Sequence, residues 1–109
     1  MKMRKAIIRP ERIDFVKKAL ENYEFYGMTV TEVMGRGDQK GITLQFRGGT
    51  MAIDLLPKIS IEVVIKHEHA ETVIRLIQPA VKTGKMGDGK IFQVPVKKMV
   101  RVRTNEVEA

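Results

Sequence analysis

The spacing of apolar residues predicts two amphipathic helices in this chain of 109 residues. The first has apolar side chains at positions i, i+3, i+7 and i+10, namely Ile13, Val16, Leu20 and Tyr23, and is expected to run to about residue 23. Pro10 suits the first turn of this helix, where its missing N–H costs nothing. The second helix is expected from about Glu68, with Pro79 kinking its last turn and Gly84 ending it. Its buried side is predicted to consist of Ala70, Val73, Ile77, Ala80 and Val81.

Alternating and continuous apolar runs predict the strands. Residues 5–9, 28–35, 58–65 and 91–96 are expected to be strands, and residues 99–103 to extend or resume the last one. The clearest is 58–65, where Ile59, Ile61, Val63 and Ile65 share one face and Lys58, Ser60, Glu62 and Val64 share the other. The order strand, helix, strand occurs twice. It predicts an α+β fold of the ferredoxin-like βαββαβ type, with a four-stranded antiparallel sheet and both helices on one face.

Two features complete this picture of a single domain over residues 1–109. Neighbouring apolar pairs such as Ile7–Ile8 and Val63–Val64 put apolar side chains on both faces of the sheet. The face without helices must then be covered, and self-association is the simplest way. Between the two halves, residues 36 to about 53 are polar, punctuated by glycine and without clear periodicity. A segment of this kind in so small a domain is usually functional or mobile.

Charge points to an anionic ligand. Of the formal net charge of +7, six units fall within residues 82–103, where the only acidic residue is Asp88 and the basic residues are Lys82, Lys85, Lys90, Lys97, Lys98, Arg101 and Arg103. The basic excess is therefore a local site, open to nucleotide, nucleic acid or an acidic membrane surface. The absence of cysteine excludes disulfides, thiol catalysis and zinc–thiolate sites. No signal peptide or membrane-spanning apolar run is evident, so a cytoplasmic location is expected.

Residues 83–92, TGKMGDGKIF, form the centre of this basic region. Three glycines within six residues let backbone N–H groups approach a ligand, and Lys85 and Lys90 add ammonium groups suited to a phosphate chain. The spacing is not that of a Walker A loop. Arg101 and Arg103 alternate on a predicted strand, which would place them on one side about 6.6 Å apart, close enough for two neighbouring phosphates. Taken alone, a surface turn and a charged strand edge explain these residues too.

This stretch resembles the C-terminal signature of the PII nitrogen-regulatory signal proteins, T-G-x-hydrophobic-G-D-G-K-hydrophobic-F, in every element. The resemblance covers nearly the whole chain, with a phosphate-binding loop at about 82–90 and a C-terminal loop at about 101–109. It implies a homotrimer whose sheets face inward, with ATP or ADP bound between subunits. The residues it assigns to nucleotide binding are Thr29, Gly35, Gly37, Asp38, Gln39, Glu62, Val64, Lys85, Gly87, Asp88, Gly89 and Lys90, with Arg101 and Arg103 from the neighbouring subunit.

The glycine-rich segment at about 36–55 resembles the T-loop of the same family, its effector arm. The resemblance implies that Gln39 ligates Mg²⁺ and that 2-oxoglutarate binds with Mg-ATP against Gln39, Lys58 and Gly87. Arg47 matches the loop-tip arginine that enters the channel mouth in ammonium-transporter regulators. The chain departs from the family pattern at two modified positions. Met51 stands where enteric members have a nucleotidylated tyrosine, and Gly49 stands where cyanobacterial relatives have a phosphorylated serine. We therefore expect ligands, and not nucleotidylation, to switch the loop.

The sequence thus predicts a cytoplasmic nitrogen regulatory protein, not an enzyme, that acts through its T-loop on an ammonium transporter at the inner membrane face or on another nitrogen-metabolism protein. One alternative is a small basic RNA-binding domain of the same fold. Against it, Phe92 is the only aromatic residue near the basic cluster, so no nucleic acid is expected as partner. An ATP-hydrolysing enzyme lacks an evident water-positioning residue. His67 and His69 are expected to be surface or capping residues rather than metal ligands.

Overall fold

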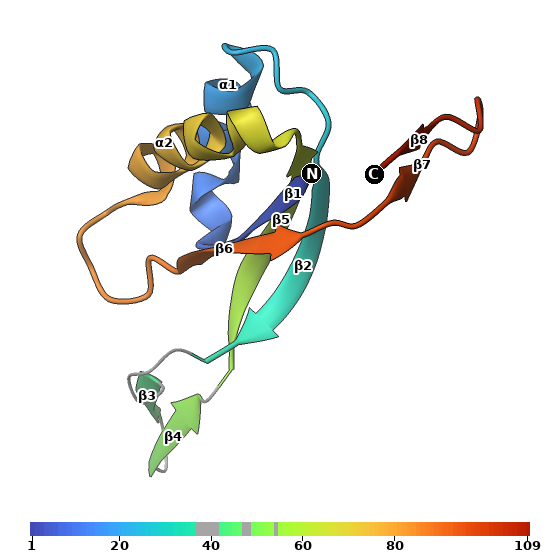
Figure 1. Ribbon diagram of the computed structural model, residues 1–109. Coiled ribbons are helices and arrows are strands. Elements are labelled where there is room, and N and C mark those ends of the chain that lie inside the picture. Colours follow the sequence, from blue (N-terminus) through green and yellow to red (C-terminus); the bar gives the residue numbers. More distant parts are fainter. Residues whose placement is uncertain (37–41, 47–48, 54) are drawn as a thin grey trace.

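The computed structural model describes residues 1–36, 42–46, 49–53 and 55–109 (Figure 1). In chain order the strands are β1 (Lys2–Ile8), β2 (Thr29–Gly35), β3 (Ile42–Phe46), β4 (Gly49–Ile53), β5 (Leu56–Ile65), β6 (Lys90–Pro95), β7 (Met99–Val100) and β8 (Val107–Glu108). The helices are α1 (Ile13–Glu21) after β1 and α2 (Ala70–Val81) after β5. Each is preceded by a 3-10 turn, Pro10–Arg12 and His67–His69 respectively.

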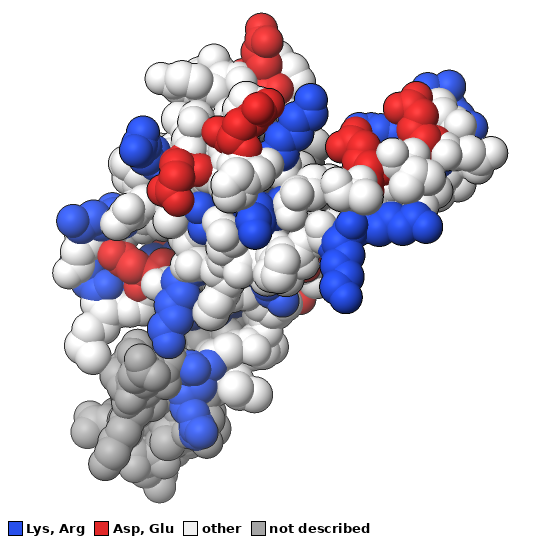
Figure 2. All heavy atoms as spheres, in the orientation of Figure 1, with Lys and Arg blue, Asp and Glu red and all other residues white. Residues whose placement is uncertain are grey.

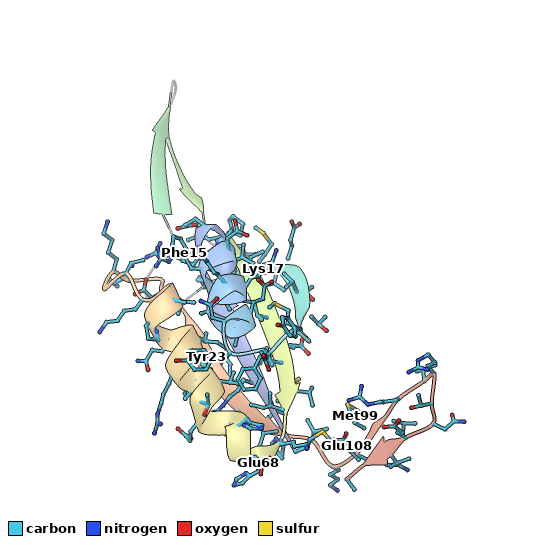
Figure 3. All side chains as sticks on the ribbon, turned by 90° about the horizontal axis from the view of Figure 1, so that it is seen from above. Phe15, Lys17, Tyr23, Glu68, Met99 and Glu108 are labelled. Carbon is cyan, nitrogen blue, oxygen red and sulfur yellow. The ribbon has the colours of Figure 1, made fainter. Side chains whose placement is uncertain are left out.

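Four strands form the central sheet in the order β2-β5-β1-β6, and every neighbouring pair is antiparallel. Helices α1 and α2 lie side by side over one face of this sheet (Figures 1 and 3). The predicted ferredoxin-like arrangement is therefore confirmed. Among the described residues, no helix is long and apolar enough to cross a membrane.

The core lies between the sheet and the helices. The strands contribute Ala6, Ile8, Ile59, Ile61, Val63 and Ile65, and the helices contribute Val16, Leu20, Ala70, Val73, Ile77 and Val81. The predicted alternation along residues 58–65 is thus confirmed, because its isoleucine and valine face is the buried one. Tyr23 departs from the prediction: α1 ends at Glu21, and the tyrosine lies beyond it in a turn with its side chain exposed (Figure 3).

Among the described residues, one charged side chain is buried in this layer. Arg4 on β1 is 5% exposed, donates from Nε to the carbonyl oxygen of Ala70 at 3.1 Å, and pairs through Nη2 with Glu71 at 3.3 Å. These bonds join β1 to the first turn of α2. They also satisfy the guanidinium, which would otherwise be costly to bury.

The opposite face of the sheet carries a mixture of polar and apolar side chains. Strand register places Lys5 between Glu62 on β5 and Phe92 on β6, and Ser60 beside Ile7. Within one chain Phe92 is 46% exposed, whereas the Ser60 hydroxyl is buried and has no hydrogen-bond partner among the described residues. This face is therefore apolar in part and open in the single chain.

Two sequence predictions need correction. Residues 36–53 were expected to lack regular structure, but β3 and β4 pair as an antiparallel hairpin from Ile42–Ile53 to Phe46–Gly49 (Figure 1). The flanking glycines break the apolar periodicity there, while β-branched residues still favour strand pairing.

The second correction concerns residues 99–103, where the extended strand stops after Val100. The chain then turns back as β8, with the Arg101 amide donating to the Glu106 carbonyl and the Asn105 amide to the Arg101 carbonyl, both at 2.8 Å. Asn105 has a φ of 61°, a left-handed conformation that asparagine tolerates in turns. Arg101 and Arg103 therefore do not alternate on a strand.

Candidate nucleotide-binding site

The glycine–lysine loop of residues 82–89 connects the end of α2 to the start of β6. Gly84, Gly87 and Gly89 have φ angles of 83°, 95° and 99°, which residues with a Cβ rarely adopt. Gly89 also packs directly against β1, where a Cβ would lie 1.8 Å from the carbonyl oxygen of Ile7. Glycine is therefore required there for two independent reasons, and the loop lies in contact with the sheet.

The Asp88 carboxylate organises the first turn of this loop. It accepts hydrogen bonds from the Thr83 hydroxyl at 2.5 Å, from the Thr83 amide at 2.8 Å and from the Gly84 amide at 2.9 Å. These bonds, led by that from the Thr83 hydroxyl and assisted by Arg9, hold the pKa of Asp88 well below its usual range. The carboxylate therefore stays ionised at neutral pH and serves the shape of the loop.

Two cations from the sheet hold the same loop. Arg9, directly after β1, donates from Nε to Asp88 Oδ1 at 3.1 Å and from Nη2 to the Met86 carbonyl. Lys58 on β5 donates from Nζ to the Gly87 carbonyl at 2.9 Å. Sequence reasoning missed Arg9, because nothing in the chain near residue 9 signals a partner 79 positions away.

A hollow of about 410 Å³ opens beside the loop; we call it the loop hollow. The end of β2 contributes Gly35 to it and the start of β5 contributes Leu56 and Lys58, so the predicted site residues of three segments come together. Its lining consists of Ile7, Gly35, Arg36, Leu56, Lys58, Lys85, Gly87, Asp88, Gly89, Lys90 and Phe92. Four of these are cations, and Figure 2 shows Lys and Arg side chains at many places on this face of the molecule. The loop hollow is therefore suited to an anion.

A second hollow, of about 420 Å³, lies at the base of the C-terminal hairpin; we call it the hairpin hollow. It brings together Thr29, Glu62, Val64 and Arg101, with Met99 and Glu108 beside them. Thr29 and Glu62 are direct partners across β2 and β5. Arg101 reaches Glu106 and Glu108 at 4.0 Å, and Figure 3 shows the hairpin of Met99 and Glu108 standing away from the sheet. Arg103 is exposed in the turn and does not line this hollow.

The two hollows lie toward opposite ends of β5. Lys58 lines the loop hollow and Val64 the hairpin hollow, and six residues of strand span about 20 Å. A single chain therefore does not bring Arg101 to the glycine–lysine loop. The predicted residues Gly37, Asp38, Gln39 and Arg47 lie outside the described residues.

The sequence profile of the family described as "Nitrogen regulatory protein P-II" matches residues 1–106. The chain belongs to the P-II family. It is 54% identical over 101 residues to "Nitrogen regulatory protein P-II 2" of Methanothermobacter thermautotrophicus, covering 93% of this chain and 88% of that protein. It is 48% identical to "Nitrogen regulatory protein P-II" of Rhizobium meliloti and 49% identical to that of Azospirillum brasilense, each over 106 residues, or 97% of this chain and 95% of the relative.

Membership of the P-II family confirms the resemblance drawn from residues 83–92 and makes the chain a nitrogen regulatory protein. No group of three or more His, Asp or Glu side chains that could hold a metal ion occurs in the part of the chain that the structure describes. His69 precedes α2 and packs its ring edge-on against Phe25, with the ring centres 5.7 Å apart. The predicted Mg²⁺ ligand Gln39 stays a prediction.

Proposed function

We propose that this P-II protein is a homotrimer that binds ATP or ADP between subunits. The observation that carries the proposal is the division of the candidate site into two hollows about 20 Å apart on one chain. One holds the glycine–lysine loop and the other holds Arg101 with Thr29, Glu62 and Val64. If neighbouring chains meet head to tail, the loop hollow of one faces the hairpin hollow of the next.

The donor set of the loop hollow fits a phosphate chain. Lys85 and Lys90 supply ammonium groups, and Gly87 and Gly89 line the same hollow with backbone whose N–H groups can donate to phosphate oxygens. In the hairpin hollow, the Glu62 carboxylate can accept bonds from ribose hydroxyls, while Val64 offers an apolar surface to a base. Arg101 and Arg103 of the neighbouring chain would add charge-assisted contacts to the phosphates.

The open face of the sheet supports the trimer. It exposes Phe92 and Val64, at 46% and 43%, on the side without helices. Covering this face with copies of the same sheet buries both side chains and surrounds Ser60, whose buried hydroxyl has no partner among the described residues. Assembly should therefore not require a ligand.

The site connects directly to the T-loop, about residues 36–55. Gly35 and Leu56, which flank that segment, both line the loop hollow. Lys58 now donates to the Gly87 carbonyl, and a 2-oxoglutarate carboxylate would compete for the same ammonium group. In this proposal 2-oxoglutarate binds only with Mg-ATP, Gln39 ligates Mg²⁺, and the ligands shift the populations of T-loop conformers.

The output of the switch is control of an ammonium transporter, or of another nitrogen-metabolism protein, through Arg47 at the loop tip. The protein is then cytoplasmic and is recruited to the inner face of the membrane by a transporter. Because Met51 offers no hydroxyl acceptor, ligand binding and not nucleotidylation sets the state of the loop.

Calorimetric titration with ATP tests this function. The double variant Arg101→Ala, Arg103→Ala should weaken ATP binding at least tenfold, since bonds to charged groups contribute about 1.5–3 kcal/mol each. The matched control Lys97→Ala, Lys98→Ala removes the same charge from residues that line neither hollow and should change affinity less than threefold.

Equal losses in the two double variants would contradict the site, since only general charge would then matter. Tighter binding of single-stranded RNA than of ATP would favour the RNA-binding alternative. Titration of 2-oxoglutarate with and without Mg-ATP completes the test, and equal binding in both conditions would contradict the linked site.

A further inference from the structure

Arg9 lines neither hollow, yet its guanidinium holds two points of the phosphate-binding loop. Its Nε donates to Asp88 Oδ1 at 3.1 Å, and its Nη2 donates to the carbonyl of Met86. Both side chains of the Arg9–Asp88 pair are 23% exposed, so the pair is largely shielded from water. The contact joins the end of β1 to the loop across 79 positions of sequence.

The bond to Met86 fixes a peptide plane. In a planar trans peptide the C=O and the following N–H point in opposite directions. Because Arg9 holds the Met86 carbonyl, the Gly87 N–H is directed away from Arg9. Gly87 lines the loop hollow and Arg9 does not. The arginine therefore determines the direction of a backbone donor at the edge of the site.

The bond to Asp88 reaches the beginning of the loop. Asp88 in turn accepts from the Thr83 hydroxyl and amide and from the Gly84 amide. One guanidinium thus supports both the first turn of the loop, through Asp88, and the peptide between Met86 and Gly87. A lysine would replace it only in part, because an ammonium donates from a single nitrogen and lacks the planar fork with which arginine reaches Asp88 and Met86 from two nitrogens.

We propose that Arg9 is a positioning residue for anion binding by this loop: it orients the Gly87 amide and the Asp88 carboxylate without contacting the ligand. The ligand is the phosphate chain assigned above, so this inference rests on the proposed function. Arg9 supplies the pre-organisation that lets the loop bind phosphate without first reordering its own backbone.

The chain offers a matched control in Arg12. It is also an arginine of the β1–α1 connection, and it donates from Nε to the backbone carbonyl of Ala80 at 3.0 Å while stacking on Phe15. It makes the same kind of bond to the end of α2, but within the described part of the chain it makes no hydrogen bond to residues 83–89. Arg9→Gln and Arg12→Gln therefore remove equal charge and a similar anchor, and differ in whether the loop is held.

The experiment has two readouts. In the ligand-free protein, amide NMR signals of Thr83, Gly84 and Gly87 should shift in R9Q and stay unchanged in R12Q. ATP affinity measured by calorimetry should fall about tenfold in R9Q and less than twofold in R12Q. R9K keeps the cation near Asp88 but loses the fork, and should weaken ATP about threefold.

The outcomes separate this inference from the proposed function. If the parent protein binds no ATP, the proposed function fails, and the amide signals of the free loop still decide whether Arg9 orients it. Unshifted loop amides in R9Q would overturn the inference, and so would shifted amides with undiminished ATP affinity. If R9Q unfolds, R9K decides: an ATP affinity equal to that of the parent protein would overturn the proposal.

Discussion

Gly89→Ala tests how closely the glycine–lysine loop approaches the sheet. The added Cβ would lie 1.8 Å from the carbonyl oxygen of Ile7 and 2.9 Å from its carbonyl carbon. Both are backbone atoms, so no change of rotamer can relieve the contact, and the Ile7–Lys90 end of the β1–β6 ladder must separate. A φ of 99° adds about 1–2 kcal/mol for any residue with a Cβ.

Loss of one backbone hydrogen bond at this end of the ladder costs about 1 kcal/mol more, so Gly89→Ala should lower the unfolding free energy by about 2–3 kcal/mol. Gly84→Ala is the matched control in the same loop. Its φ is 83°, but no atom lies within 4 Å of the added Cβ, so only the conformational cost of about 1 kcal/mol applies.

Urea denaturation of the two variants at one protein concentration compares these costs, since assembly makes stability depend on concentration. Gly89→Ala should unfold at a clearly lower urea concentration than Gly84→Ala. Equal midpoints for the two variants would refute the close packing of loop and strand.

Two further predictions concern charged groups. Arg4→Ala should lower the unfolding free energy by about 2–3 kcal/mol, because the buried Ala70 carbonyl loses its charged donor; a loss below 0.5 kcal/mol in urea denaturation would contradict this. The folded-state pKa of Asp88 is lowered, so its support of the loop is complete above its unfolded pKa of about 4 and is lost as pH falls through the lower folded value. Amide NMR signals of Thr83 and Gly84 should therefore stay constant from pH 8 to 5, and a transition between pH 6 and 7 would contradict the assignment.

Much of the fold could be predicted, because strands and helices that are buried on one side only have apolar residues at regular spacings in the sequence. The alternation along 58–65 and the helical spacing of Val73 and Ile77 come directly from burial on one side. The β3–β4 hairpin was missed because glycines interrupt its pattern. The prediction of a strand over residues 99–103 was wrong, because alternating residues fit a straight strand and a tight hairpin equally well. In the structure the chain turns back through Asn105, which has a left-handed conformation.

Part of the candidate site could likewise be predicted from the sequence, and part could not. The loop could be predicted from its glycines and lysines, which are adjacent in sequence and carry their chemistry locally. Arg9 could not, since its contact with Asp88 depends on the tertiary packing of β1 against the loop. The separation of Arg101 from the loop also required the structure, because only strand order shows that the two lie toward opposite ends of β5.

The most direct test of the central claim, a nucleotide site shared between chains, mixes two defective variants. One carries Lys85→Ala and Lys90→Ala in the loop hollow, and the other carries Arg101→Ala and Arg103→Ala. The two variants are unfolded and refolded together. In randomly assembled head-to-tail trimers, about a quarter of the interfaces then combine an unmutated loop hollow of one chain with unmutated Arg101 and Arg103 of the next. Calorimetry should then detect ATP binding of parental affinity at that fraction of sites. A mixture that binds ATP only as weakly as the separate variants would contradict a site formed between subunits.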